Sequence, residues 1–218
     1  MHPARFSDEL LWVIGAHLQP GWRVLDPFAG TGRIHELLPH VDVQTVGVEL
    51  EPDWAELHPR TLVGDATALP FPAASFDAVA TSPTYGNRFA DHHTARDGST
   101  RRSYTHDLRA MTGDPERKLH PRNTGSLRFG PRYQELHASA WREAWRVVRP
   151  GGCLVLNVKD HYARGELVPV VAWHRAALQG IGWREAVELQ VPVRGLRHGA
   201  NRELRVDIEH VITFTRTG

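Results

Sequence analysis

Three carboxylic acids follow short apolar runs in the first third of the chain, and a glycine-containing turn follows the first of them. Asp26 opens the segment D-P-F-A-G-T-G, which ends at Gly32 and leads into an expected helix to about Leu38. Glycine allows close approach of a ligand and a positive φ, and the start of a helix offers free backbone N–H groups. A dinucleotide site would need the spacing G-x-G-x-x-G to seat a pyrophosphate, whereas this segment has only G-T-G. The pattern therefore favours a nucleoside ligand without a phosphate bridge.

The other two acids occupy matching places after the next two runs. Glu49 ends the run from Thr45, where its carboxylate can accept hydrogen bonds from both hydroxyls of a ribose. Asp65 follows the run 61–64, where it can accept from an adenine amino group. Each acid alone would be an ordinary solvated strand end. Because three acids at the ends of three successive strands point at one crevice, where open α/β sheets bind ligands, we expect a shared site.

A fourth apolar run, 76–81, ends in the tetrad Ser82-Pro83-Thr84-Tyr85. The order D-P-F-A-G-T-G, then Glu49, then Gly64-Asp65, then S-P-x-Y resembles the class I S-adenosylmethionine-dependent methyltransferases. Within them it is similar to the amino-methyltransferases of nucleic acid bases, and the resemblance extends from His2 to the final pair of strands. A Ser-Pro-Pro-Tyr or Ser-Pro-Pro-Phe tetrad is typical of the cytosine-N4 enzymes, whereas the adenine-N6 enzymes more often begin with Asp or Asn.

The resemblance implies S-adenosyl-L-methionine as the cofactor and a site-specific DNA methyltransferase as the activity, with cytosine N4 as first choice and adenine N6 as second. The residues that it implies for cofactor binding are Phe6, Ser7, Asp26, Phe28, Gly30, Gly32, Glu49 and Asp65. It implies that Ser82, Pro83 and Tyr85 are catalytic. The Ser82 side chain and the Pro83 carbonyl would accept the two amine hydrogens, and Tyr85 would stack on the base. Thr84 departs from the family, because it replaces the second proline and brings an N–H and a hydroxyl to the loop.

These residues need a sheet to position them, and the alternation of apolar runs with amphipathic stretches predicts a parallel sheet covered by helices. We expect one α/β domain over residues 1–218, with a Rossmann-like class I methyltransferase fold. Its sheet would be seven-stranded and mostly parallel, with a C-terminal antiparallel hairpin. Helices are expected from Ser7, near 135–148 and near 167–179, the fifth strand at 153–159, and the last two strands near 186–193 and 206–216. No period is visible between Gly86 and Gln134, so we expect an irregular basic insert at about 86–135.

Basic charge collects in two segments outside the expected sheet. The formal net charge is +1, yet residues 86–135 hold ten Lys or Arg against six Asp or Glu, and residues 194–205 hold four Arg against one Glu. Each segment alone would be interpreted as a solvated loop. For the two together, solvated loops and a surface that faces an anionic partner are equally good interpretations. The partner would be DNA, with RNA as the alternative. The residues expected to contact it are Arg88, Arg101, Arg102, Arg197 and Arg202.

Composition excludes several other classes of protein. The chain has one cysteine, Cys153, which excludes an internal disulfide and a multi-cysteine zinc site. The spacing of the histidines of the insert matches no zinc pattern, so we expect no metal. No apolar run reaches the roughly 18 residues of a membrane span, and the start MHPARFSDELLWVIG lacks a secretory pattern. We therefore expect a cytoplasmic protein of a prokaryotic or phage-infected cell, with a place in restriction-modification.

Both basic segments are short for target recognition. We therefore expect low specificity, a homodimer, or an additional recognition subunit. Two other functions stay open: methylation of an RNA base or a protein amide, and a non-catalytic cofactor-binding subunit. The protein-amide enzymes more often show Asn-Pro-Pro-Tyr, so Ser82 argues against them, and Thr84 is the one hint of a non-catalytic subunit.

The basic segments give a prediction about salt dependence. Neutralising Arg101 and Arg102, or Arg197 and Arg202, should weaken DNA binding, and each phosphate contact removed should lower the slope of log K against log salt by about one. Fluorescence anisotropy across a salt series measures the slopes, and cofactor affinity serves as the control that should not change. Equal slopes in the wild type and both double variants would mean that neither segment contacts phosphate.

Overall fold

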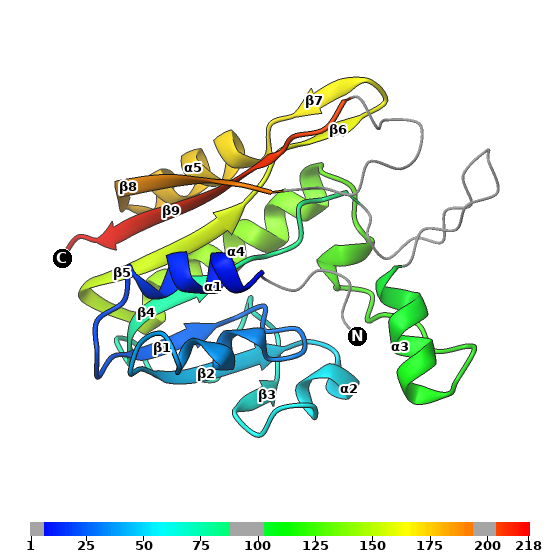
Figure 1. The fold of residues 1–218 in the computed structure, drawn as a ribbon, viewed down its shortest axis with the longest axis horizontal. Coiled ribbons are helices and arrows are strands. Elements are labelled where there is room, and N and C mark those ends of the chain that lie inside the picture. Colours follow the sequence, from blue (N-terminus) through cyan, green and yellow to red (C-terminus); the bar gives the residue numbers. More distant parts are fainter. Residues whose placement is uncertain (1–6, 88–102, 194–203) are drawn as a thin grey trace.

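The computed structural model describes residues 7–87, 103–193 and 204–218, which form an α/β fold around a seven-stranded sheet (Figure 1). The strands are β1 (Arg23–Asp26), β2 (Gln44–Glu49), β3 (Thr61–Val63), β4 (Phe76–Thr81), β5 (Val148–Val158), β8 (Trp183–Pro192) and β9 (Ile208–Arg216). Their order in the sheet is β3-β2-β1-β4-β5-β9-β8. The first five are parallel, and β9 runs antiparallel to both β5 and β8. The predicted fold class is therefore confirmed, including the C-terminal antiparallel hairpin.

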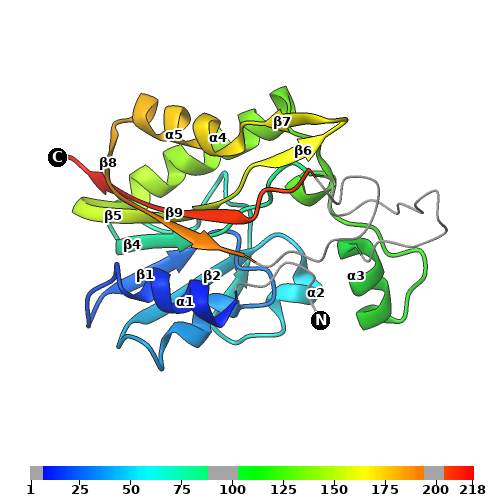
Figure 2. The ribbon, with the colours of Figure 1, turned by 45° about the horizontal axis from the view of Figure 1, so that its top comes forward.

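Helices cover both faces of this sheet (Figure 2). One face packs against α1 (Asp8–Gly15) and the 3-10 helix η1 (Arg33–Leu37), and the other against α4 (Pro131–Val147) and α5 (Val170–Ile181). Adjacent strand residues alternate between the two cores: Val24 belongs to the α1 side and Leu25 to the side that contains the fully buried Trp141. Burial on both faces explains why the strands are nearly continuous apolar runs.

A short hairpin separates β5 from α5, where the sequence predicted a helix from about residue 167. Its strands are β6 (His161–Ala163) and β7 (Glu166–Val168), and Arg164 and Gly165 both have positive φ. Two consecutive positive φ values suit a tight two-residue hairpin turn. Helix α5 begins only after Pro169, and the Asp160 side chain accepts a hydrogen bond from the Val171 N–H.

The insert is more regular than predicted, and the expectation of an irregular segment is wrong for 104–112 and 124–126, which are helical. Helix α3 (Tyr104–Thr112) begins with a capping box formed by Ser103 and His106 and ends at Gly113, which has a left-handed φ of 69°. A 3-10 turn, η2 (Thr124–Ser126), precedes α4. The helix escapes detection because only Tyr104 and Leu108 are buried apolar residues on it, one turn apart.

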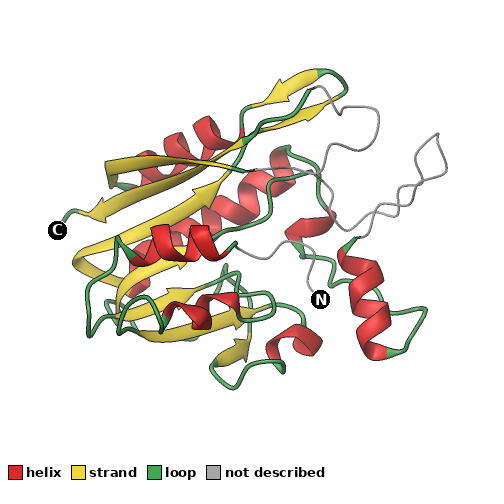
Figure 3. Ribbon diagram, in the orientation of Figure 1, coloured by secondary structure: helices red, strands yellow, loops and turns green. Residues whose placement is uncertain are grey.

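The insert leaves and rejoins the domain at neighbouring positions. Asn87 forms a β-bridge with Arg128, and the Phe129 N–H donates to the Gly86 carbonyl over 2.8 Å. Gly86 permits this approach, because a Cβ there would lie 2.7 Å from the Phe129 nitrogen. The carboxyl ends of the parallel strands point toward α3 and α2 (Pro52–Ala55), so the insert lies at that edge of the sheet (Figure 3).

In the described ranges, the helices are too short or too polar for any of them to cross a membrane.

The closure at Gly86 can be tested with a pair of glycine substitutions. Gly21 and Gly86 both have a positive φ, of 82° and 69°, but only at Gly86 would an added Cβ meet another part of the backbone. Gly21→Ala should lower the free energy of unfolding by about 1 kcal/mol through backbone strain alone. Gly86→Ala should cost clearly more. Urea unfolding of both variants measures the difference, and equal losses would show that the contact with Phe129 yields easily.

Candidate active site

A cavity of about 480 Å³ lies where the parallel strands end. Its volume falls in the range of roughly 300–1,000 Å³ that is usual for small-molecule sites. The three predicted acids, Asp26, Glu49 and Asp65, all line it, although the first and the last lie 39 positions apart in sequence. Three successive strand ends therefore contribute to one site, as expected for an open α/β sheet.

Glu49 lies at the end of β2 and is nearly buried, with 7% of its surface exposed. One carboxylate oxygen accepts from the Gly30 N–H over 2.8 Å and the other from the Glu51 N–H over 2.9 Å. An ionised carboxylate has about four acceptor sites, so about two stay open for a ligand such as a ribose diol. Burial raises the pKa of Glu49 to about 7, and the two backbone N–H groups only partly offset this effect.

Asp26 lines the cavity and also holds neighbouring parts of the backbone together. One of its oxygens accepts from the Thr81 hydroxyl over 2.6 Å and from the Phe28 N–H over 3.0 Å, which ties the glycine turn to β4. Burial raises the pKa of Asp26 to about 6 despite these hydrogen bonds. The Phe28 ring also lines the cavity and stacks on the buried His137 at 5.4 Å between ring centroids.

Asp65 pairs with a residue of the insert. The Arg122 side chain donates to Asp65 over 2.7 Å, and Thr67 donates to the other carboxylate oxygen from both its N–H and its hydroxyl. Burial alone would raise the pKa of Asp65, but the hydrogen bonds from Thr67 and the Arg122 charge outweigh burial and lower it. Asp65 therefore stays ionised and able to accept a further hydrogen bond.

The other predicted cofactor residues have different places. Gly30 lines the cavity, whereas Gly32 is not among its lining residues and faces His58, to which an added Cβ would come within 2.9 Å. Ser7 caps α1 by accepting from the Leu10 N–H, and Leu10 rather than Ser7 reaches the cavity. Six residues with predicted roles lie outside the described part of the chain: Phe6, Arg88, Arg101, Arg102, Arg197 and Arg202.

The tetrad after β4 shares the cavity with the acids. Ser82, Pro83 and Tyr85 all line it, and the Ser82 hydroxyl lies 3.1 Å from the Tyr85 hydroxyl. Burial, together with the negative charge of Glu209, raises the pKa of Tyr85 well above its usual value. Tyr85 therefore keeps its proton at any physiological pH.

Thr84 connects the tetrad to the rest of the molecule. Its hydroxyl donates to the Thr124 hydroxyl over 2.8 Å, and its carbonyl accepts from the buried Tyr133 hydroxyl over 2.7 Å. A proline at this position would lack the first of these contacts. The replacement in the tetrad is thus matched by a partner in η2.

A chain of hydrogen bonds in the core supports the Tyr133 contact. The Trp141 indole donates to Nδ1 of His174, whose Nε2 lies 2.9 Å from the Tyr133 hydroxyl. Burial lowers the pKa of His174 well below its usual value, so the ring is neutral and the proton must sit on Nε2. Tyr133 then accepts from His174 and donates its own hydrogen to the Thr84 carbonyl.

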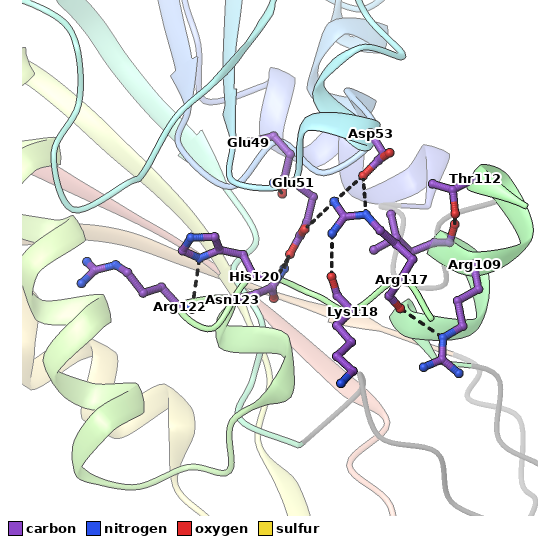
Figure 4. A network of polar contacts seen from close by, with 11 residues as sticks. Glu49, Glu51, Asp53, Arg109, Thr112, Arg117, Lys118, His120, Arg122 and Asn123 are labelled. Carbon is purple, nitrogen blue, oxygen red and sulfur yellow. Dashed lines mark hydrogen bonds and ion pairs between the residues drawn. The ribbon is translucent and has the colours of Figure 1, made fainter. Parts of the chain in front are cut away.

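A polar network connects the insert to the segment that follows β2 (Figure 4). Glu51, which is 1% exposed, accepts from the His120 N–H and the Asn123 side chain and lies near the Arg117 guanidinium. Arg117 also donates to Asp53. Beside this network, Tyr104 of α3 packs edge-on against Trp54 of α2.

This network changes the interpretation of the basic insert. The sequence predicts that Arg117 and Arg122 face solvent or an anionic partner, but both form ion pairs with carboxylates of the same chain. Net charge along the sequence cannot reveal such pairing, because the acids are more than fifty residues away. The charge available for a nucleic acid is accordingly smaller than the sequence suggests.

Comparison with known proteins shows a similarity to methyltransferases in this region. The profile described as "Methyltransferase domain" matches residues 25–95. The type II methyltransferase M.Cfr9I of Citrobacter freundii is 39% identical over 67 residues, which are 30% of this chain and 22% of that protein. The match thus spans about a fifth of that relative's length.

Solved structures with the same fold align over nearly the whole chain. A SAM-dependent methyltransferase from Methanosarcina mazei has a TM-score of 0.60 at 14% identity, covering 98% of this chain and 99% of that one. A chain from the complex of the Haloferax volcanii Trm112 methyltransferase activator with a methyltransferase has a TM-score of 0.59 at 15% identity, covering 94% and 87%. The [4+2]-cyclase SpnF has a TM-score of 0.58 at 15% identity, covering 99% and 85%. At these identities the likeness shows the fold alone, since one fold can serve several reactions.

The groups of the cavity fit S-adenosylmethionine as the cofactor. Glu49 has acceptor sites left for the ribose, Asp65 has one for an adenine amine, and Phe28 contributes an apolar part of the cavity wall. Sequence reasoning found these residues but missed Asn157, Glu209 and Arg122, which line the same cavity. Asn157 carried a signal, because it is a polar residue inside the otherwise apolar run 153–158.

Glu49 should make cofactor binding depend on pH. Only the ionised carboxylate can accept from both ribose hydroxyls, and its pKa in the folded protein is about 7. The affinity for S-adenosylmethionine should therefore rise between about pH 6 and about pH 8 and then level off. Isothermal titration calorimetry at several pH values measures this rise. Glu49→Gln should bind weakly with a flatter profile, and a wild-type profile as flat as the variant's would contradict the assignment.

The raised pKa of Glu49 should have the opposite effect on the stability of the ligand-free protein, which should fall as the pH rises. The pKa of Glu49 rises from an ordinary value of 4.5 to about 7 on folding, so between these pH values the folded state alone holds the proton. The free energy of unfolding should therefore contain a contribution that falls as pH rises through this window. Thermal melts of the wild type and Glu49→Gln, compared across the window, isolate that contribution.

Proposed function

We propose that this chain, a class I S-adenosylmethionine-dependent methyltransferase, transfers a methyl group to the exocyclic amine of a DNA base. Cytosine N4 is the first choice and adenine N6 the second. The observation that carries the proposal is the tetrad Ser82-Pro83-Thr84-Tyr85 in the wall of the cavity that also contains Glu49 and Asp65. A serine-headed tetrad at this place favours an amine as acceptor, because it offers two hydrogen-bond acceptors side by side.

The reaction requires little more than positioning. S-adenosylmethionine supplies an electrophilic methyl group on sulfur. The base amine is a poor nucleophile because its lone pair is conjugated with the ring. When the Ser82 hydroxyl and the Pro83 carbonyl accept its two hydrogens, the nitrogen becomes pyramidal and its lone pair turns toward the methyl carbon. The new N–C bond forms as the S–C bond breaks, and the alkylated nitrogen then releases one proton to solvent.

The Tyr85 ring is proposed to stack on the base. Its hydroxyl lies beside Ser82, which leaves the ring face as the part available for a ligand in the cavity. In a duplex the base must first leave the stack, at a cost of a few kcal/mol. A flat aromatic surface in the site compensates part of the stacking that is lost.

DNA as the substrate is supported by the tetrad and by the relationship to a protein named as a type II methyltransferase. In the described part of the insert, Arg117 and Arg122 form ion pairs within the chain. Target recognition therefore needs further contacts. We propose that they come from the two segments whose arginines were named above, from a second copy of the chain, or from a partner subunit. One structural neighbour belongs to a complex with a methyltransferase activator, which is an assembly of this last kind.

The substrate can be identified by mass analysis of nucleosides. DNA, RNA and a protein extract are each incubated with the enzyme and cofactor carrying a labelled methyl group, and then digested. Label in N4-methylcytosine supports the first choice, and label in N6-methyladenine the second. Label only in RNA or protein would replace DNA as the substrate, and its absence from all three would favour a non-catalytic subunit.

Ser82→Ala tests the catalytic assignment. The variant should lower kcat on the order of 100-fold, because it removes an acceptor that acts on the amine in the transition state. Its Kd for S-adenosylmethionine should stay near that of the wild type. Ser75→Ala is the matched control, since the Ser75 hydroxyl donates to the nearby Pro72 carbonyl and Ser75 is not among the residues that line the cavity. Wild-type turnover in Ser82→Ala would show that another group orients the amine.

A further inference from the structure

Beneath the tetrad lies a polar group that the proposed reaction does not yet use. Nδ2 of Asn157, near the end of β5, lies 3.2 Å from the Ser82 hydroxyl and 3.3 Å from the Tyr85 hydroxyl. The same nitrogen lies 2.9 Å from a carboxylate oxygen of Glu209 on β9. Asn157 is 1% exposed, and it is the one polar side chain among residues 153–158 apart from the cysteine.

The sheet register brings Asn157 and Glu209 together. Asn157 pairs directly with Val211, and Glu209 lies two residues before Val211 on the same face of β9. Diagonal neighbours of this kind are within reach of a long side chain. The contact is therefore a product of the antiparallel pairing of β5 with β9 and not of a flexible loop.

Glu209 determines which end of the Asn157 amide faces the tetrad. An ionised carboxylate only accepts hydrogen bonds, so the NH₂ group of Asn157 must point toward it. One of the two amide hydrogens then goes to Glu209, and the other is left for Ser82 and Tyr85. A flipped amide would place two acceptor oxygens against each other in a buried site, which is costly.

The hydrogens of the tetrad follow from this orientation. If Asn157 donates to one lone pair of the Ser82 oxygen, the serine hydrogen is free to point at the Tyr85 oxygen 3.1 Å away. The second lone pair of Ser82 is then the one available to the cavity, where the amine would bind. Without a donor beneath it, the hydroxyl could rotate and present its hydrogen to the amine instead.

We propose that Asn157, anchored by Glu209, is a positioning residue for methyl transfer that orients the Ser82 hydroxyl as an acceptor and holds Tyr85 beside it. This inference rests on the proposed function of the tetrad. Asn157 acts through Ser82 and does not itself touch the reacting atoms.

Three variants separate positioning from a structural role. Asn157→Asp removes the donor and places two carboxylates together, so both stability and kcat should fall. Glu209→Gln releases the amide from its fixed orientation, so kcat should fall with less loss of stability. The double variant Asn157→Asp with Glu209→Gln restores a hydrogen bond between positions 157 and 209, but the donor now sits on residue 209.

The double variant should therefore regain thermal stability while its kcat stays on the order of 10- to 100-fold below that of the wild type. Its KM for DNA and its Kd for S-adenosylmethionine should stay close to wild type. Glu188→Gln is the matched control, because Glu188 pairs with Arg175 and His210 outside the cavity and should not affect kcat. Recovery of kcat together with stability in the double variant would overturn the proposal.

A spectroscopic measurement keeps this test independent of the reaction. The side-chain NH₂ signals of Asn157 in a ¹⁵N-labelled sample should shift in Ser82→Ala and in Glu209→Gln, and remain unchanged in Glu188→Gln. If the wild type methylates no nucleic acid, the proposed function fails while these shifts still decide whether Asn157 binds Ser82. Unchanged Asn157 signals in Ser82→Ala would exclude the positioning role even in an active enzyme.

Discussion

The Glu49 carboxylate is the point at which the separate parts of this site meet. It accepts from the glycine turn after β1 through Gly30 and from the start of α2 through Glu51. Glu51 in turn receives donors from the insert, so one buried acid at the end of β2 links the turn, the helix and the insert. A buried carboxylate without these donors would be strongly unfavourable, and the surrounding backbone must therefore keep its shape. The open acceptor sites of the same group are those that a ribose can use.

Hydrogen bonds from several elements likewise hold the tetrad in place. Ser82 and Tyr85 are supported from below by β5 and β9, and Thr84 is supported from the sides by η2 and α4. The support from α4 depends on a neutral His174, which burial ensures, so the buried histidines belong to the framework of the site rather than to its chemistry. Reactive groups are thus positioned by regular elements, although they themselves lie on a loop.

The sequence predicts those parts of the molecule whose signal is local. Apolar runs predict the strands, and the acids at their ends predict the cavity, because in a parallel sheet such ends share one edge. Helix α3 was missed because two buried apolar residues, Tyr104 and Leu108, are too few to show a period. The pairing of Arg122 with Asp65 was missed because it depends on how the insert folds back, which no local pattern contains. Asn157 lies between these cases: its polarity inside an apolar strand is visible, but its partners come from the loop after β4 and from β9.

The closed base of the insert has a consequence for how related proteins can differ. The chain departs at Gly86 and returns at Phe129, whose backbones are hydrogen-bonded to each other. The ends of the insert are thus held together, and the length of chain between them affects loop-closure entropy weakly, by roughly 0.6 kcal/mol for each doubling. Such a segment can differ in length at little cost where it keeps the residues that contact Glu51, Asp65 and Thr84.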